Sequence, residues 1–199
     1  MNKHKKYDAS SIEVLEGLEP VRRRPGMYIG GTDNASMHHL FSEVIDNAMD
    51  EAVANFASFI EVKVETDNTI SIYDNGRGIP IDPHPNFPDK SALEVIMTTL
   101  HAGGKFSNKV YQTSGGLHGV GISVVNALSE FVDVEVYRDK KIYNQKFSKG
   151  YPTSKLKEVK KKTNKKGTKI SFKPDPEIFG SDNNFNCNKL YDFSKSVSY

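Results

Sequence analysis

The longest helical pattern in the sequence lies between residues 37 and 54. Within it, Val44, Ile45, Ala48 and Ala52 recur at the spacing that places apolar side chains on one stripe of a helix. We therefore predict a central helix from about residue 37 to residue 54. Shorter patterns predict further helices over residues 91–100 and 122–131.

A second pattern, strict alternation of apolar and polar residues, begins at residue 60. Ile60, Val62 and Val64 fall on one face of an extended chain, and the alternation resumes at Ile70 and Ile72 after a turn at residues 67 and 68. This pattern predicts a β-hairpin with one buried face. Segments 132–139, 142–148 and 168–174 are also predicted as strands, whereas the proline-rich segment 81–88 and the glycine-rich segment 101–121 are predicted as loops. Antiparallel strands with a few helices predict an α/β fold of two layers, with the helices gathered on one face.

The composition is that of a soluble globular protein. The chain has 199 residues, of which 37% are hydrophobic and 26% charged, enough for one large domain or two small ones. It contains neither an apolar run of the ~20 residues needed to cross a bilayer nor the apolar core of a signal peptide, so we expect a cytoplasmic location. A single cysteine, Cys187, excludes a disulfide framework and a cysteine-rich zinc site. The formal net charge of +2 is too small for a strongly basic nucleic-acid binder, so any contact with DNA would need a local patch.

The central helix carries an unusual acidic face in the segment "EVIDNAMDEA". Glu43, Asp46, Asn47 and Asp50 lie three or four residues apart, so three carboxylates and an amide share one side of the helix without a neighbouring cation. Taken alone, this face is more typical of a solvated acidic surface than of a binding site.

The glycine-rich segment has the context of a phosphate-binding loop but not the established motifs. In "GLHGVGIS", Gly116 and Gly121 have the Walker spacing, but Ile122 stands where a P-loop requires lysine. Val124 stands where the dinucleotide motif requires its third glycine, so that motif is excluded as well. Two interpretations stay open at equal weight: an anion bound at the start of the following helix, and a flexible surface loop.

Two other motifs each allow a structural and a functional interpretation. In "YDNGRGIP", Asp74 is expected on the buried face of its strand, where it either caps a turn or accepts a ligand's amino group while Gly76 and Gly78 let the ligand approach the backbone. The segment "KEVKKKTNKKGTK" carries seven lysines. A solvated, poorly ordered loop is the favoured interpretation of this run, and contact with phosphate or DNA is the alternative.

Together the motifs resemble a known family. "EVIDNAMDEA", "DNGRGIP", "HAGGKF", "SGGLHGVGISVVNALS" and "KKGTKISF" occur in the order and near the spacing found in the ATPase domain of bacterial type IIA topoisomerases. That domain belongs to the superfamily of gyrase, Hsp90, histidine kinases and MutL, with the two-layer Bergerat fold of a mixed, mostly antiparallel sheet. Within the family, the chain looks more like the ATPase subunit of topoisomerase IV than that of gyrase.

The resemblance implies a role for residues of the central helix and the strand ends. Glu43 would be the general base that activates water, and Asn47 would ligate Mg²⁺. Asp74 would receive the adenine amino group, with Gly78 and Thr168 beside it. Three further residues would lie at the rim of the pocket, where Glu51 pairs with Arg77 and Arg138 is the arginine that aminocoumarin inhibitors use in relatives; ordinary surface ion pairs are the alternative for these arginines.

The resemblance also implies a lid and a dimerisation arm. Residues 101–121 would form the lid that folds over ATP, with Gly104, Lys105 and Tyr111 in it. Its last part would wrap the phosphates with backbone amides and comprises Gly116, Leu117, His118, Gly119, Val120, Gly121 and Ile122; a structural role for the histidine is equally expected. Residues 1–16 would form an arm that crosses to a second subunit and places Tyr7 against the partner's nucleotide.

As a whole, residues 1–199 would form one ATPase domain whose transducer and later domains are absent. We expect this chain to bind ATP and Mg²⁺ with little or no turnover in isolation. In the complete enzyme, ATP would close a homodimeric gate around DNA, in partnership with the DNA-cleaving A subunit, for decatenation or relaxation. The alternatives are the ATPase subunit of a gyrase, which supports supercoiling, and a non-catalytic nucleotide-sensing or chaperone-like module on the same fold.

Overall fold

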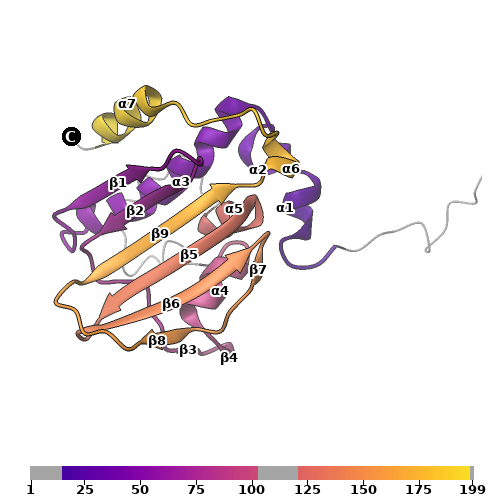
Figure 1. Ribbon diagram of the computed structural model, residues 1–199. Helices are drawn as coiled ribbons and strands as arrows, with labels where there is room; N and C mark the ends of the chain where they lie inside the picture. The colour runs from indigo at the N-terminus through magenta and orange to yellow at the C-terminus, as the bar shows by residue number, and fades with distance from the viewer. Residues whose placement is uncertain (1–14, 103–120, 198–199) are drawn as a thin grey trace, which may run out of the picture.

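A seven-stranded antiparallel sheet forms the centre of the computed structural model, which describes residues 15–102 and 121–197. Six strands follow the order β1-β2-β9-β5-β6-β7, and β8 pairs with β6 (Figure 1). A separate ladder joins β3 to β4. The strands are β1 (Ile60–Val64), β2 (Ile70–Asp74), β3 (Pro83–His84), β4 (Phe87–Ser91), β5 (Ser129–Arg138), β6 (Lys141–Ser148), β7 (Tyr151–Pro152), β8 (Lys157–Val159) and β9 (Gly167–Pro174).

Helices cover one face of this sheet. The helices are α1 (Glu19–Arg23), α2 (Gly26–Ile29), α3 (Asn34–Val53), α4 (Ala92–Thr98), α5 (Ile122–Ala127), α6 (Pro176–Phe179) and α7 (Cys187–Val197). Figure 1 shows α3, α4 and α5 behind the sheet and α7 beyond β1. The predicted two-layer α/β fold is therefore confirmed. Among the residues that the structure describes, no helix is long and apolar enough to cross a membrane.

The hydrophobic core fills the space between the two layers. Leu40 and Val44 of α3 are fully or almost fully buried, as are Val134 of β5 and Ile170 and Phe172 of β9. Burying aliphatic and aromatic side chains of this size contributes roughly 1.5–3 kcal/mol each, so the apolar stripe of α3 is held firmly on the sheet.

The central helix and the first hairpin form as predicted. α3 begins at Asn34, three residues before the predicted start, because the Asp33 carboxylate accepts a hydrogen bond from the Ser36 backbone N–H at 2.8 Å and caps the helix. β1 and β2 pair antiparallel, with Val62 opposite Ile72. β2 continues the sheet by pairing with β9, which sets Asp74 opposite Thr168.

Two predicted segments differ in the structure, and one further helix was not predicted. The helix predicted over residues 122–131 ends at Ala127, because Ser129 and Phe131 pair with β9 and begin β5. The segment 81–88, predicted as a loop, contributes to the β3–β4 ladder, where Pro83 is tolerated because the ladder has only two strands.

The third difference is α7, which the sequence analysis missed. Its Leu190 is buried, and the ring of Phe193 contacts that of Phe41 with centroids 6.0 Å apart. Leu190, Phe193 and Val197 have the spacing of one helix face, so the signal was present in the sequence.

Candidate functional site

The acidic face of α3 points into the molecule. Glu43 is 8% exposed and Asp50 5% exposed, while Asp46 and Asn47 are half-buried. The interpretation of this face as a solvated acidic surface is therefore wrong. Carboxylates are seldom buried without a specific purpose, because removing them from water is costly.

Glu43 contacts the entrance to α5. Its Oε2 accepts a hydrogen bond from the Gly121 backbone N–H at 2.8 Å. Gly121 has a φ of 82° and precedes the first residue of the helix. This contact fixes the carboxylate of a buried residue at the point where the glycine-rich segment joins α5, which is where the sequence predicts phosphate binding.

Asp74 closes β2 with a buried carboxylate. The side chain is 4% exposed, and its Oδ1 accepts a hydrogen bond from the Gly76 backbone N–H at 2.8 Å. Burial raises the pKa of Asp74 from 3.8 to about 6, and the charge of Glu51 adds to this rise, while hydrogen bonds from the backbone of Gly76 and Thr168 oppose it. The predicted turn-capping role is confirmed, and a buried acid with a raised pKa is also typical of functional sites.

Two glycines beside Asp74 lie where neighbouring atoms leave no room for a larger side chain. A Cβ atom on Gly76 would lie 2.8 Å from the Asp74 and Glu51 carboxylates. Gly78 has a φ of +78°, and a Cβ there would lie 3.1 Å from the Arg138 side chain and the Gly167 carbonyl. Glycine at these two positions therefore lets the neighbouring side chains and the Gly167 carbonyl pack closely around the turn.

Gly167 is a site residue that the sequence analysis did not single out. Its φ is +111°, and a Cβ atom would lie 1.9 Å from the Asp74 carbonyl oxygen. Only glycine allows β9 to approach the end of β2 this closely. The signal was the glycine in "KKGTKISF", but its meaning depends on the pairing of two strands that lie far apart in the chain.

Thr168 and Arg138 complete the wall around Asp74. Thr168 is buried, and its Oγ1 accepts a hydrogen bond from the Ile79 backbone N–H at 3.1 Å. Arg138, at the end of β5, donates from Nη1 to the Gly78 carbonyl at 3.3 Å. The structure thus brings together three residues, Asp74, Gly78 and Thr168, that the sequence analysis placed around one ligand group, with Arg138 beside them. We call this set, with Gly76 and Gly167, the strand-end wall.

Glu51 and Arg77 pair as predicted. Arg77 Nη2 lies 2.6 Å from Glu51 Oε1, and both the side-chain Nε and the backbone N–H of Arg77 donate to Oε2 at 3.1 and 2.9 Å. The guanidinium also lies 3.7 Å from the centroid of the Phe56 ring. These contacts tie the end of α3 to the turn after β2.

α3 therefore links the two halves of the site. Glu43 near its middle contacts Gly121, and Glu51 near its end contacts Arg77. Eight residues of helix separate the two glutamates by about 12 Å along the axis. That distance suits a ligand with an extended chain between two polar ends.

Part of the predicted site lies outside the described residues: Tyr7, Gly104, Lys105, Tyr111, Gly116, Leu117, His118, Gly119 and Val120. Ile122 is described, and its side chain is buried in the core, so any contact with a phosphate would have to come from its backbone. The described residues contain no group of three or more histidine, cysteine or acidic side chains that could hold a metal ion by themselves. A metal bound beside Asn47 would therefore take most of its ligands from elsewhere.

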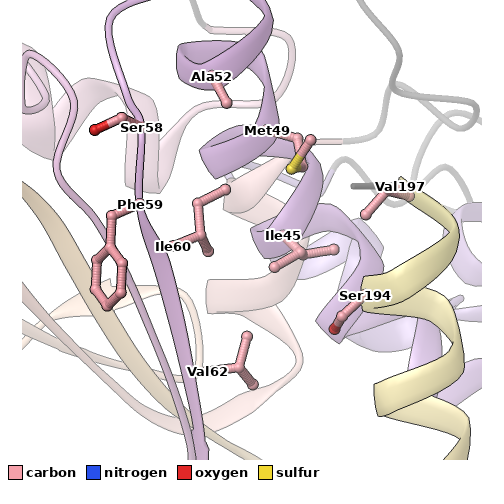
Figure 2. A pocket seen from close by; sticks show the side chains of 9 residues that line it. All are labelled: Ile45, Met49, Ala52, Ser58, Phe59, Ile60, Val62, Ser194 and Val197. Carbon is pink, nitrogen blue, oxygen red and sulfur yellow. The ribbon is translucent and has the colours of Figure 1, made fainter. Parts of the chain in front are cut away.

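A separate apolar groove lies on the other side of α3. It has a volume of about 330 Å³ and runs between α3, β1 and α7 (Figure 2). Ile45, Met49 and Ala52 line it from α3, about half a helical turn away from Glu43 and Asn47. The groove is therefore distinct from the strand-end wall.

Similar proteins carry the same domain. The chain is 63% identical to the B subunit of DNA topoisomerase 4 from Rickettsia felis over 97% of its length, and 57% identical to the B subunit of DNA gyrase from Thermotoga maritima over 87%. These matches span 29% and 27% of the two relatives. The crystal structure of the 43K ATPase domain of Thermus thermophilus gyrase B in complex with an aminocoumarin is 46% identical, with a TM-score of 0.79, over 92% of this chain and 45% of that one.

The predicted resemblance to the ATPase subunits of topoisomerase IV and gyrase is confirmed by these similarities. The model of the histidine kinase-, DNA gyrase B- and HSP90-like ATPases matches residues 32–178, a range that contains α3, the strand-end wall and α5. The chain belongs to this family of ATPases.

Proposed function

We propose that this chain is the ATP-binding and ATP-hydrolysing domain of the ATPase subunit of a cytoplasmic type II DNA topoisomerase, of the topoisomerase IV form. The observation that carries the proposal is the pair of buried carboxylates that α3 connects, Glu43 on α3 itself and Asp74 at the end of β2. A buried carboxylate at the entrance of α5 and a buried carboxylate in the strand-end wall are held at the two ends of one site.

The strand-end wall is suited to the adenine. Asp74 accepts a hydrogen bond from the exocyclic amino group in our proposal, and its buried position favours a ligand that donates to it. Gly76 and Gly78 carry no side chain, so the flat ring would meet only their backbone. Thr168 offers a hydroxyl beside the carboxylate, and Arg138 borders the rim where an aminocoumarin could also bind.

Glu43 is suited to the role of general base. Its carboxylate would take a proton from the water that attacks the γ-phosphorus, as the bond between that phosphorus and the bridging oxygen breaks to leave ADP and phosphate. The contact with the Gly121 N–H orients the carboxylate toward the start of α5. Backbone N–H groups there, together with the glycine-rich segment 116–122, are proposed to bind the phosphates.

Asn47 fits a Mg²⁺ site that relies on the substrate. It lies one turn beyond Glu43 on the same side of α3 and is half-buried. Mg²⁺ is commonly held by one or two protein oxygens together with phosphate oxygens and water, which agrees with a single amide ligand here. The bound ion would neutralise charge on the phosphates.

In the complete enzyme, ATP binding is proposed to close a dimer of this subunit through the arm of residues 1–16, with Tyr7 against the partner's nucleotide. Gate closure would trap one DNA segment for passage through another that the A subunit has cut. The similarity to the topoisomerase 4 relative from Rickettsia felis supports this proposal and favours decatenation and relaxation over supercoiling.

Replacing Glu43 in the full-length protein tests the proposal. For Glu43→Ala we expect ATP turnover to fall roughly 10²–10⁴-fold, while ATP still binds, because a general base acts on the chemical step. Glu65→Gln, which removes an exposed carboxylate from the β1–β2 turn, is the control and should hydrolyse ATP normally. Unchanged turnover in Glu43→Ala would remove Glu43 from the mechanism, whereas no turnover in the wild-type protein would favour a non-catalytic nucleotide-sensing module.

A further inference from the structure

One edge of the sheet carries a dense row of lysines. Seven of the twelve residues from 155 to 166 are lysine, and none of the twelve is arginine or aromatic. All seven lysines are exposed. We call this set the lysine edge: Lys155, Lys157, Lys160, Lys161, Lys162, Lys165 and Lys166.

The segment that carries the lysine edge is joined to the sheet by hydrogen bonds at several points. Lys157 belongs to β8, which pairs antiparallel with β6 at the outer side of the sheet (Figure 1). Beyond β8, the Thr163 backbone N–H donates to the Lys140 carbonyl at 3.1 Å, and the Tyr73 hydroxyl donates to the Lys166 carbonyl at 3.0 Å. Residues 160–166 lie outside helices and strands and their lysines are exposed, so the prediction of a solvated loop between strands is confirmed there, and these hydrogen bonds attach the loop to the sheet.

Neighbours within the described residues do not neutralise the charges of the lysine edge. The one acidic residue between residues 155 and 166, Glu158, pairs with Lys141 of β6 at 2.9 Å. Among the described residues, no carboxylate forms an ion pair with any of the seven lysines. Lysines elsewhere on the sheet differ in this respect, since Lys63, Lys146 and Lys173 each pair with an acid.

We propose that the lysine edge binds the sugar–phosphate backbone of duplex DNA. Seven cations spread along a strand and the following loop match a linear polyanion better than a single nucleotide. Lysine contacts phosphate as a point charge and does not give the planar bidentate recognition of arginine, so the binding is independent of sequence. The absence of aromatic residues from residues 155–166 disfavours a single strand, whose bases stack on exposed rings.

The lysine edge is continuous with the strand-end wall. Lys166 is followed directly by Gly167, which packs against the end of β2. Lys165 Nζ lies 5.3 Å from the ring of Tyr73 and 5.9 Å from that of Tyr137. The proposal rests on the proposed function, in which duplex DNA is the substrate, and it places one DNA contact next to the nucleotide.

A charge-matched pair of triple variants tests the proposal. Lys160→Gln/Lys161→Gln/Lys162→Gln removes three charges from the lysine edge and leaves Lys165 and Lys166, which contact Tyr73, intact. Lys63→Gln/Lys146→Gln/Lys173→Gln removes the same charge from paired lysines on the strands. The readout is fluorescence anisotropy with a short labelled duplex between about 50 and 200 mM salt, where each phosphate contact adds roughly 0.9 to the slope of log K against log salt.

We expect the lysine-edge variant to bind duplex DNA at least about tenfold more weakly at the low-salt end and to lose about three units of the salt slope, while the control stays close to wild type. Equal losses in both variants, or no binding of the wild-type chain to duplex DNA, would overturn the proposal. So would tighter binding to a single strand, or binding to anionic lipid vesicles without binding to DNA. Calorimetry with ADP on the same proteins separates the two proposals: retained ADP binding without DNA binding rejects only the lysine edge as a DNA site.

Discussion

The strand-end wall and the phosphate end of the proposed site are built differently. The wall is assembled from the ends of β2, β5 and β9, and strand pairing fixes the register of Asp74 and Thr168. The phosphate end joins one helix side chain, Glu43, to the residue that follows a long glycine-rich segment, Gly121. The sheet therefore positions the wall before a ligand arrives. The position of the phosphate end depends instead on the segment that precedes α5.

This difference suggests a division of labour. In the proposed site, a rigid wall would give affinity and select the base, because its polar groups are already oriented. In the proposed site, the phosphate end lies beside the glycine-rich segment, so it would bind the triphosphate and respond to its hydrolysis. Changes in the wall should therefore alter affinity and stability together, whereas changes at Glu43 should alter turnover alone.

The largest effect on the wall is expected from Gly167→Ala. The new Cβ would overlap the Asp74 carbonyl and require a strained φ of +111°, so we expect a loss of roughly 2–5 kcal/mol in the free energy of unfolding. Gly180→Ala is the matched control, because Gly180 has a φ of +80° but nothing within 4 Å of its Cβ position. Denaturant unfolding of both variants measures the difference, and equal losses would show that the close approach of β9 to β2 is unimportant.

Asp74→Asn should stabilise the unliganded protein at alkaline pH. The pKa of Asp74 is raised to about 6 in the folded state, so the folded protein binds more protons than the unfolded chain between pH 3.8 and 6 and loses stability as the pH rises through this range. Removing the charge should raise the free energy of unfolding by up to about 3 kcal/mol at pH 8 and leave it unchanged below pH ~4.

Asp67→Asn provides the opposite control in the same experiment. Hydrogen bonds from Thr69 lower the pKa of Asp67, so its contribution to stability is present above its unfolded pKa and is lost as the pH falls. In thermal unfolding from pH 3 to 8, Asp67→Asn should therefore destabilise the protein near neutral pH and have no effect in acid. If Asp74→Asn followed the trend of Asp67→Asn, burial would not raise the pKa of Asp74 as we infer.

The smallest effect is expected from Arg77→Ala at the rim. This arginine is exposed, and its pair with Glu51 and its contact with Phe56 should together contribute less than ~1 kcal/mol. We expect nucleotide affinity to fall less than about fivefold in a calorimetric titration. Arg23→Ala, which breaks the exposed pair with Glu19 far from the site, is the control. A loss as large as that from a change at Asp74 would make the rim pair a principal ligand contact.

The sequence predicted the parts of this site that depend on local patterns. The alternation of β2 placed Asp74 on the buried face, and helical spacing placed Glu43, Asn47 and Glu51 along one helix. The pair of Glu51 with Arg77 came from the family resemblance and is confirmed.

Features that depend on contacts between distant segments were not predicted. Gly167 matters only because β9 pairs with β2, which lies about a hundred residues earlier in the chain. Residues 128–131 have a helical pattern but do not continue α5, because residues from 129 onward pair with β9 and these hydrogen bonds outweigh a weak local preference for helix. The attachment of the lysine edge to the sheet likewise depends on the pairing of β8 with β6 and on the hydrogen bond from Tyr73.

Calorimetric titration of a non-hydrolysable ATP analogue with Mg²⁺ into the wild-type chain and Asp74→Asn at pH 8 tests the central claim most directly. We predict one nucleotide per wild-type chain and an affinity roughly 10–100-fold weaker in the variant, because the adenine loses a charged acceptor. No binding to a wild-type chain with a normal unfolding transition, or equal affinity in the two proteins, would contradict a nucleotide site built on the strand-end wall.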